Sequence, residues 1–71
     1  MYTYRLVEEW GFHEDIGRFR TFGIAVYRNS RLLFLRSDVF AGRAVVEEIC
    51  RLCTAEQVEP VHLEDVIEDS L

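Results

Sequence analysis

Hydrophobic and polar residues alternate through the first half of the chain, a pattern typical of half-buried β-strands. We expect strands over residues 2–10, 19–28 and 31–36, and a polar loop over the glycine-bracketed segment 11–17. Asn29 and Ser30 separate the last two strands, and asparagine tolerates the positive φ of a two-residue hairpin turn. Gly23 lies inside the second strand, which indicates a bulge or a close approach of another group there.

The spacing of the apolar residues then changes from that of a strand to that of a helix. The positions that carry this helical spacing are Ala41, Val45, Ile49 and Leu52. They predict a helix over residues 40–53, with Ser37 or Asp38 as its N-terminal cap. Residues 54–60 form a connector, because Pro60 cannot continue the helix.

The last stretch, EPVHLEDVIEDSL, combines one histidine with many carboxylates. Its apolar residues fall on one face of a short helix that begins after His62, and its acidic residues lie mostly on the other face. This density of charge is therefore the outer face of a helix rather than a metal or acid–base site. The predicted fold class is α+β: a single domain over residues 1–71, with a three-stranded antiparallel β-meander followed by two α-helices packed on one sheet face.

The predicted hairpin has two apolar faces. A turn at residues 29–30 pairs Val26 with Leu33 and Ile24 with Leu35 on one face, and Tyr27 with Leu32 and Ala25 with Phe34 on the other. Two short helices cover only one side of such a sheet, so Tyr27, Leu32 and Phe34 are left as an exposed interaction surface. We expect a homo-oligomer that associates through this surface, or an unknown protein partner; the alternative is that a loop or bend of the same chain covers it.

Charge is distributed unevenly between the two halves of the chain. Every basic residue is an arginine, and residues 1–43 carry a formal charge of +2 while residues 44–71 carry −7. The second half repels a phosphate backbone, so nucleic acid is an unlikely partner. An arginine-mediated nucleic-acid or anionic-ligand binding module is the alternative function. Its candidate residues are Arg18, Arg20, Arg28, Arg31 and Arg36.

Two groups of like charges lack an obvious partner in the sequence. Arg28 faces Arg31 across the predicted hairpin, and like charges in such a pair are unfavourable. Glu68 and Asp69 lie near the end of the last helix, where the helix dipole disfavours negative charge. We expect acidic residues near the arginine pair, and an arginine of a partner near the two acids.

The chemically reactive residues give weak signals. Cys50 and Cys53 have the spacing of redox and zinc sites, but they lie at the end of a helix where the dipole raises a thiol pKa, and no further ligand motif accompanies them. We interpret both as buried apolar residues. His13 with Glu14 and Asp15 is interpreted as a solvated turn rather than an acid–base cluster. We therefore expect no enzymatic activity, with no catalytic residue, cofactor or metal.

The expected cellular location follows from two kinds of segment that the sequence lacks, a membrane span and a signal peptide. No run approaches the roughly 20 apolar residues of a membrane span, and the beginning of the chain lacks the basic and apolar regions of a signal peptide. We expect a cytoplasmic protein without membrane contact.

Several short motifs resemble a family of short bacterial proteins classified only as a domain of unknown function. They are Thr21-Phe22-Gly23-Ile24, Cys53, and a C-terminal pattern of Pro60, His62, Leu63, Asp65, Val66, Glu68, Asp69 and Leu71. An asparagine tends to follow the cysteine in the family pattern, whereas this chain has Thr54. The resemblance implies a small cytoplasmic protein and transfers no activity or catalytic residues.

Overall fold

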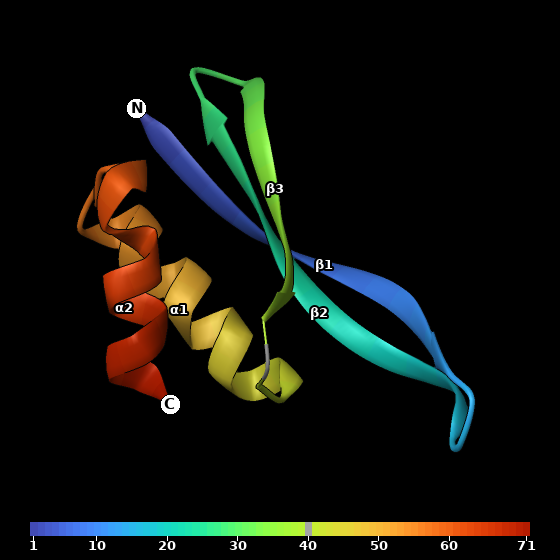
Figure 1. Cartoon of the computed structure of the whole chain (residues 1–71). Coiled ribbons are helices and arrows are strands. Elements are labelled where there is room, and N and C mark those ends of the chain that lie inside the picture. The colour runs from blue at the N-terminus through green and yellow to red at the C-terminus, as the bar shows by residue number, and fades with distance from the viewer. Residues whose placement is uncertain (40) are drawn as a thin grey trace.

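The three strands form one antiparallel sheet in chain order. The computed structural model describes residues 1–39 and 41–71, so the predicted helix start at residue 40 lies outside the described residues. The strands are β1 (Tyr2–His13), β2 (Gly17–Arg28) and β3 (Arg31–Val39), with β2 in the centre (Figure 1). The predicted α+β meander is therefore confirmed, although all three strands are longer than predicted.

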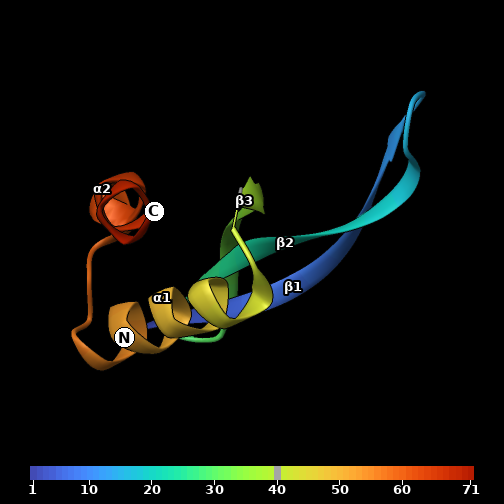
Figure 2. The same cartoon turned by 90° about the horizontal axis from the view of Figure 1, so that it is seen from below.

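The helical part follows the sheet and covers one of its faces. Helix α1 (Arg43–Ala55) packs on β1 and β2, and α2 (Leu63–Ser70) follows a short 3-10 turn, η1 (Pro60–His62), and lies beside α1 (Figures 1 and 2). His62 is the N-cap residue of α2, as predicted. The cap of α1 is Gly42, so the predicted caps Ser37 and Asp38 are wrong, because both residues belong to β3.

One face of the sheet and the inner faces of both helices make up the core. Alternate residues of the paired strands point toward the helices, and Tyr4 and Val26 lie opposite each other at the centre of this face. The buried cluster consists of Tyr4, Ile24, Val26, Val39, Val46, Ile49, Cys50, Cys53, Leu63 and Ile67. The end of α1 is tied to β1 by Thr54, whose Oγ1 accepts a hydrogen bond from the Tyr4 N–H at 3.0 Å.

The hairpin of β1 and β2 extends beyond the helices as a two-stranded arm (Figure 1). The predicted polar loop over residues 11–17 is wrong, because β1 continues to His13 and β2 starts at Gly17. Only residues 14–16 form the turn, and Gly17 has a positive φ of 74° there. The ring of Phe19 covers Gly11 from the opposite strand, so a Cβ at Gly11 would lie 2.4 Å from that ring.

The hairpin of β2 and β3 has the predicted turn but not the predicted register. Asn29 and Ser30 have φ values of 49° and 70°, as a two-residue turn of the type I′ class requires. The predicted Tyr27–Leu32 pair is confirmed, but β3 is irregular at the next step and Val26 pairs with Phe34.

This irregularity corrects the predicted faces. Ala25 pairs with Leu35 and Ile24 with Arg36, so the predicted pairs of Val26 with Leu33, Ile24 with Leu35 and Ala25 with Phe34 are all wrong. Because Val26 points toward the helices, Phe34 lies on the helix face and does not share a face with Tyr27 and Leu32. An extra residue in one strand of a pair shifts every later side chain relative to its partner strand.

A second bulge lies where β3 leaves the sheet. Phe22 pairs with Val39 and Ile24 with Arg36, so two residues of β3, Ser37 and Asp38, lie opposite Gly23. Asp38 has a positive φ of 53°. The Glu9 carboxylate reaches across Gly23 and accepts hydrogen bonds from the Ser37 hydroxyl at 3.0 Å and the Asp38 N–H at 3.1 Å. The bulge expected from Gly23 is thus present, and a carboxylate of β1 stabilises it.

Candidate interaction surface

Strand β3 is an edge strand with apolar side chains exposed along it. It pairs with β2 on one side, and within the described residues no strand pairs with its other side. Four consecutive side chains, Leu32, Leu33, Phe34 and Leu35, are 54%, 44%, 40% and 45% exposed. Exposed apolar edge strands pair readily with other chains. We call Leu32–Leu35 together with Tyr27 the β3 edge surface.

The β3 edge surface spans both faces of the sheet. Leu32 and Leu35 lie on the face away from the helices, where they pair with Tyr27 and Ala25. Phe34 lies on the helix face, and Leu33 lines a shallow hollow together with Arg28 and Arg31. Of the predicted surface residues, Leu32 and Phe34 are exposed and Tyr27 is half-buried, so they form an edge rather than one flat face.

The five candidate arginines lie in three separate places. Arg18 and Arg20 stack over the ring of Trp10 on the arm, with guanidinium carbons 4.9 and 5.3 Å from the ring centroid. Arg28 and Arg31 face each other at the opposite end of β2. Arg36 binds Glu64 of α2 in an ion pair. They therefore do not form one continuous basic surface.

Acidic side chains of the helices are only partly paired. Arg36 with Glu64, Arg43 with Glu8 and Glu47, and Arg51 with Glu48 form ion pairs. The hydrogen bond that the Arg36 guanidinium donates to the Glu64 carboxylate raises the pKa of Arg36. Within the described residues, neither Glu68 nor Asp69 has a basic partner, and neither Arg28 nor Arg31 has an acidic one. The acidic neighbour expected beside Arg28 and Arg31 is thus not supplied by the same chain.

The arm exposes a second group of apolar residues, at positions predicted to form a strand end and a polar loop. Trp10 is 60% exposed, Phe12 73% and Ile16 69%. Trp10 and Phe12 lie on the same face of β1 as Tyr4, the face that the helices cover further along the strand. The arm extends past the helices, so no helix covers these two side chains (Figure 1). The continued alternation from Trp10 to Phe12 was the signal that could have extended the predicted strand.

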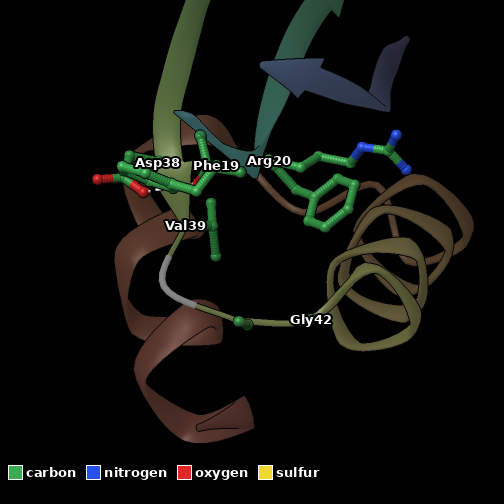
Figure 3. A pocket seen from close by; sticks show the side chains of 8 residues that line it. Phe19, Arg20, Asp38, Val39 and Gly42 are labelled. Carbon is green, nitrogen blue, oxygen red and sulfur yellow. Dashed lines mark hydrogen bonds between the residues drawn. The ribbon is translucent and has the colours of Figure 1, made fainter. Parts of the chain in front are cut away.

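A hollow of about 400 Å³ lies where β2, the end of β3 and the start of α1 meet. Phe19 and Val39 contribute to its lining, and Figure 3 shows the Asp38 carboxylate and the Arg20 guanidinium pointing away from each other on opposite sides. Polar groups of a ligand site converge on one point, and these two do not. We therefore assign no ligand to this hollow.

The other candidate reactive residues are Cys50 and Cys53, which lie in the core, and His13, which lies beside the turn of the arm. Cys50 and Cys53 are buried free thiols, which confirms their interpretation as apolar core residues. Burial raises the pKa of Cys50 to about 11 and also raises the pKa of Cys53. His13 accepts a hydrogen bond at Nδ1 from the Asp15 N–H at 3.2 Å, within an exposed turn. Over residues 1–39 and 41–71, no three His, Cys, Asp or Glu residues gather in a way that could hold a metal ion.

The buried Cys50 thiol and the buried Tyr4 hydroxyl should make the folded protein less stable in alkaline solution. Burial raises the pKa of Cys50 from 9.0 to about 11 and that of Tyr4, whose hydroxyl donates to the Val58 carbonyl, from 10.0 to about 12. Between about pH 9 and 11 for Cys50, and between about pH 10 and 12 for Tyr4, the unfolded chain loses the proton while the folded chain keeps it. The free energy of unfolding therefore falls with rising pH by up to about 1.4 kcal/mol per pH unit for each group. Urea unfolding at a series of pH values measures this slope.

Two variants assign the alkaline slope to its groups. Cys50→Ala removes the Cys50 share of the decline that begins near pH 9.0 and leaves the share of Cys53, whose pKa burial also raises, and Tyr4→Phe removes the part that begins near pH 10.0. A free energy of unfolding that stays constant across this range in the unaltered protein contradicts the assignment.

Comparison with known proteins places the whole chain in one family. None of the helices within the described residues has the length and apolar character of a membrane-spanning segment. No curated protein and no solved structure matches the chain. A family model described as "Family of unknown function (DUF6514)" matches residues 1–71. The chain therefore belongs to the DUF6514 family.

Proposed function

We propose that this protein is a non-enzymatic protein-binding module that associates with a second copy of itself through the β3 edge surface. The observation that carries the proposal is the row of four exposed apolar side chains on an edge strand, each at least 40% exposed. Proteins commonly protect an edge strand with charged residues, proline, β-bulges or a covering segment. Residues 32–35 contain no charge and no proline, their pairing with β2 is irregular only at Leu33, and no described strand pairs with their outer side.

A second β3 strand is a suitable partner for such an edge. Antiparallel pairing of two β3 strands supplies the backbone N–H and C=O groups that an edge strand leaves unpaired. It also brings the apolar side chains of the two strands side by side on both faces of the enlarged sheet. A copy of the same chain therefore matches both requirements of this surface.

The distribution of arginines favours a protein partner over nucleic acid. Arg18 and Arg20 lie on the arm, Arg28 and Arg31 lie at the other end of β2, and Arg36 is paired within the chain. Nucleic-acid binding requires several basic side chains along one surface, and the formal charge of −7 over residues 44–71 opposes a phosphate backbone. We therefore treat arginine-mediated anion binding as the less supported function.

Sedimentation velocity at a series of concentrations tests self-association. We expect the unaltered protein to change from monomer to dimer at micromolar concentration, on the order of 10 µM. Phe34→Arg places a charge on the β3 edge surface, so it should raise the dissociation constant at least about tenfold. Leu33→Arg is a second variant of the same surface and should have the same effect.

The matched control is Phe12→Arg, the same substitution at an exposed phenylalanine on the arm. It should leave the association of the protein unchanged. Circular dichroism verifies that each variant is folded. The proposal is wrong if the unaltered protein stays monomeric into the high micromolar range, or if Phe34→Arg and Leu33→Arg associate as strongly as Phe12→Arg.

A further inference from the structure

The hairpin end of the sheet carries two arginines without an acidic partner. Arg28 pairs with Arg31 across the turn and with Tyr2 of β1, which packs against the core, so both arginines belong to the helix face. Both are exposed. Directly opposed like charges destabilise a strand pair, so a carboxylate placed above them is favourable.

Helix α2 carries unpaired carboxylates on the same side of the sheet. Glu64 binds Arg36 of β3, which shows that this side of α2 faces β3. Glu68 lies four residues later, on the same side of the helix and one turn closer to its end. There the helix dipole disfavours a negative charge, and Glu68 has no basic partner within the described residues.

The directions of β3 and α2 place the two arginines, Arg28 and Arg31, at one end of the β3 edge surface and Glu68 at the other. Both elements run the same way, from the hairpin turn toward the start of α1 (Figure 1). Arg31 begins β3, and Arg36, beside Glu64, comes after the apolar stretch. In an antiparallel pair of β3 strands centred on Phe34, Arg31 of one copy therefore lies opposite Ser37 of the other, next to Arg36 and below α2.

We propose that the second copy binds antiparallel along β3, with Arg31 of each copy paired with Glu68 on α2 of the other; this arrangement rests on the proposed self-association. The two-fold axis passes through the middle of the β3 edge surface and gives two equivalent ion pairs per dimer. Arg28 lies beside Arg31 and adds to the positive charge facing α2 of the other copy. An arginine and a carboxylate that lack partners in the single chain are thereby paired, and the edge of each β3 strand is closed, so pairing through β3 stops at two copies.

Charge reversal tests the arrangement in the full chain. Arg31→Glu or Glu68→Arg alone turns two attractive contacts per dimer into repulsive ones, so each should raise the dissociation constant about tenfold in low salt. The double variant, Arg31→Glu with Glu68→Arg, restores the pairs with opposite signs and should return the constant to within about threefold of the unaltered protein. In 1 M salt, where the screening length is about 3 Å, the single variants should differ little from the unaltered protein.

Arg18→Glu on the arm is the matched control for Arg31→Glu and should leave the dissociation constant unchanged. Arg31→Gln and Glu68→Gln, which remove one charge without reversing it, serve if a reversal variant does not fold. The antiparallel arrangement is overturned if the single reversals or neutral variants do not weaken the dimer more than Arg18→Glu, or if the double variant stays as weak as the single ones.

The two proposals fail in different ways. If Phe34→Arg separates the copies while charge changes at Arg31 and Glu68 have no effect, self-association through β3 stands and the arrangement of the second copy is wrong. If the unaltered protein is monomeric at all concentrations, both proposals are wrong.

Discussion

Ile24→Ala should destabilise the folded protein by about 2–5 kcal/mol, the range for deleting a buried aliphatic side chain that leaves a cavity. Ile24 is 0% exposed and lies in the central strand, between Leu6 of β1 and Arg36 of β3. It belongs to the same buried cluster as residues from both helices. A domain of this size has a total stability of only about 5–10 kcal/mol or less, so this one substitution should remove a large part of it.

Ile16→Ala is the matched control, because it deletes the same atoms from a side chain that is 69% exposed in the turn of the arm. Its effect should stay within about 0.5 kcal/mol. Urea unfolding followed by circular dichroism measures both values, at a protein concentration held constant because association also contributes to stability. Equal losses at the two positions would falsify the assignment of Ile24 to the core.

Gly23→Ala should destabilise the protein by about 1–2 kcal/mol. A Cβ at Gly23 would lie 2.8 Å from the Arg36 carbonyl oxygen, 3.0 Å from Glu9 Oε2 and 3.3 Å from the Ser37 Cα. Two of these neighbours are backbone atoms of the β3 bulge, so the strand itself has to move. Such overpacking costs about 1–3 kcal/mol, and the reduced freedom of the unfolded chain offsets about 0.4–1 kcal/mol of that loss.

The control for Gly23→Ala is Gly42→Ser, because a Cβ at Gly42 meets no heavy atom within 4 Å. Gly42 is the N-cap of α1 and has no side-chain cap, so a serine there should stabilise the protein by a few tenths of a kcal/mol. The midpoints of thermal unfolding should therefore move in opposite directions. A Gly23→Ala variant as stable as the unaltered protein contradicts the close contact between β1, β2 and the β3 bulge.

The bulge at Gly23 also affects the proposed association. It ends the regular pairing of β3 with β2 and leads the chain from the sheet edge toward α1, where Val39 is buried in the core. Glu9 holds this bend from β1 through Ser37 and Asp38. Residues 32–35 are thus left as the apolar part of an edge that ends at the Ser37–Asp38 bulge, and bulges are one of the means by which proteins limit pairing along an edge.

Local sequence patterns determined the type and order of the elements. Alternation over residues 2–10 and 19–28, the Asn29-Ser30 turn, the helical spacing of Val45, Ile49 and Leu52, and the cap at His62 each reflect interactions between residues close in sequence. Such interactions do not depend on the rest of the fold. The α+β class, the burial of Cys50 and Cys53 and the exposure of Leu32 could therefore be predicted from the sequence, whereas Phe34 is exposed on the opposite face of the sheet from the one predicted.

The tertiary structure alone decided the register of β3, the cap of α1 and the partners of the charged residues. The irregular step at Leu33 depends on how β3 fits against β2, and the second bulge depends on Glu9, a residue 28 positions away from Ser37. These contacts moved Phe34 to the helix face and joined Arg36 to Glu64, while Arg28, Arg31 and Glu68 stayed without partners in the single chain. A sequence pattern gives the spacing of residues along the chain but not the distance in space between remote segments. A register shift of one residue moves every side chain that follows to the other face of the sheet.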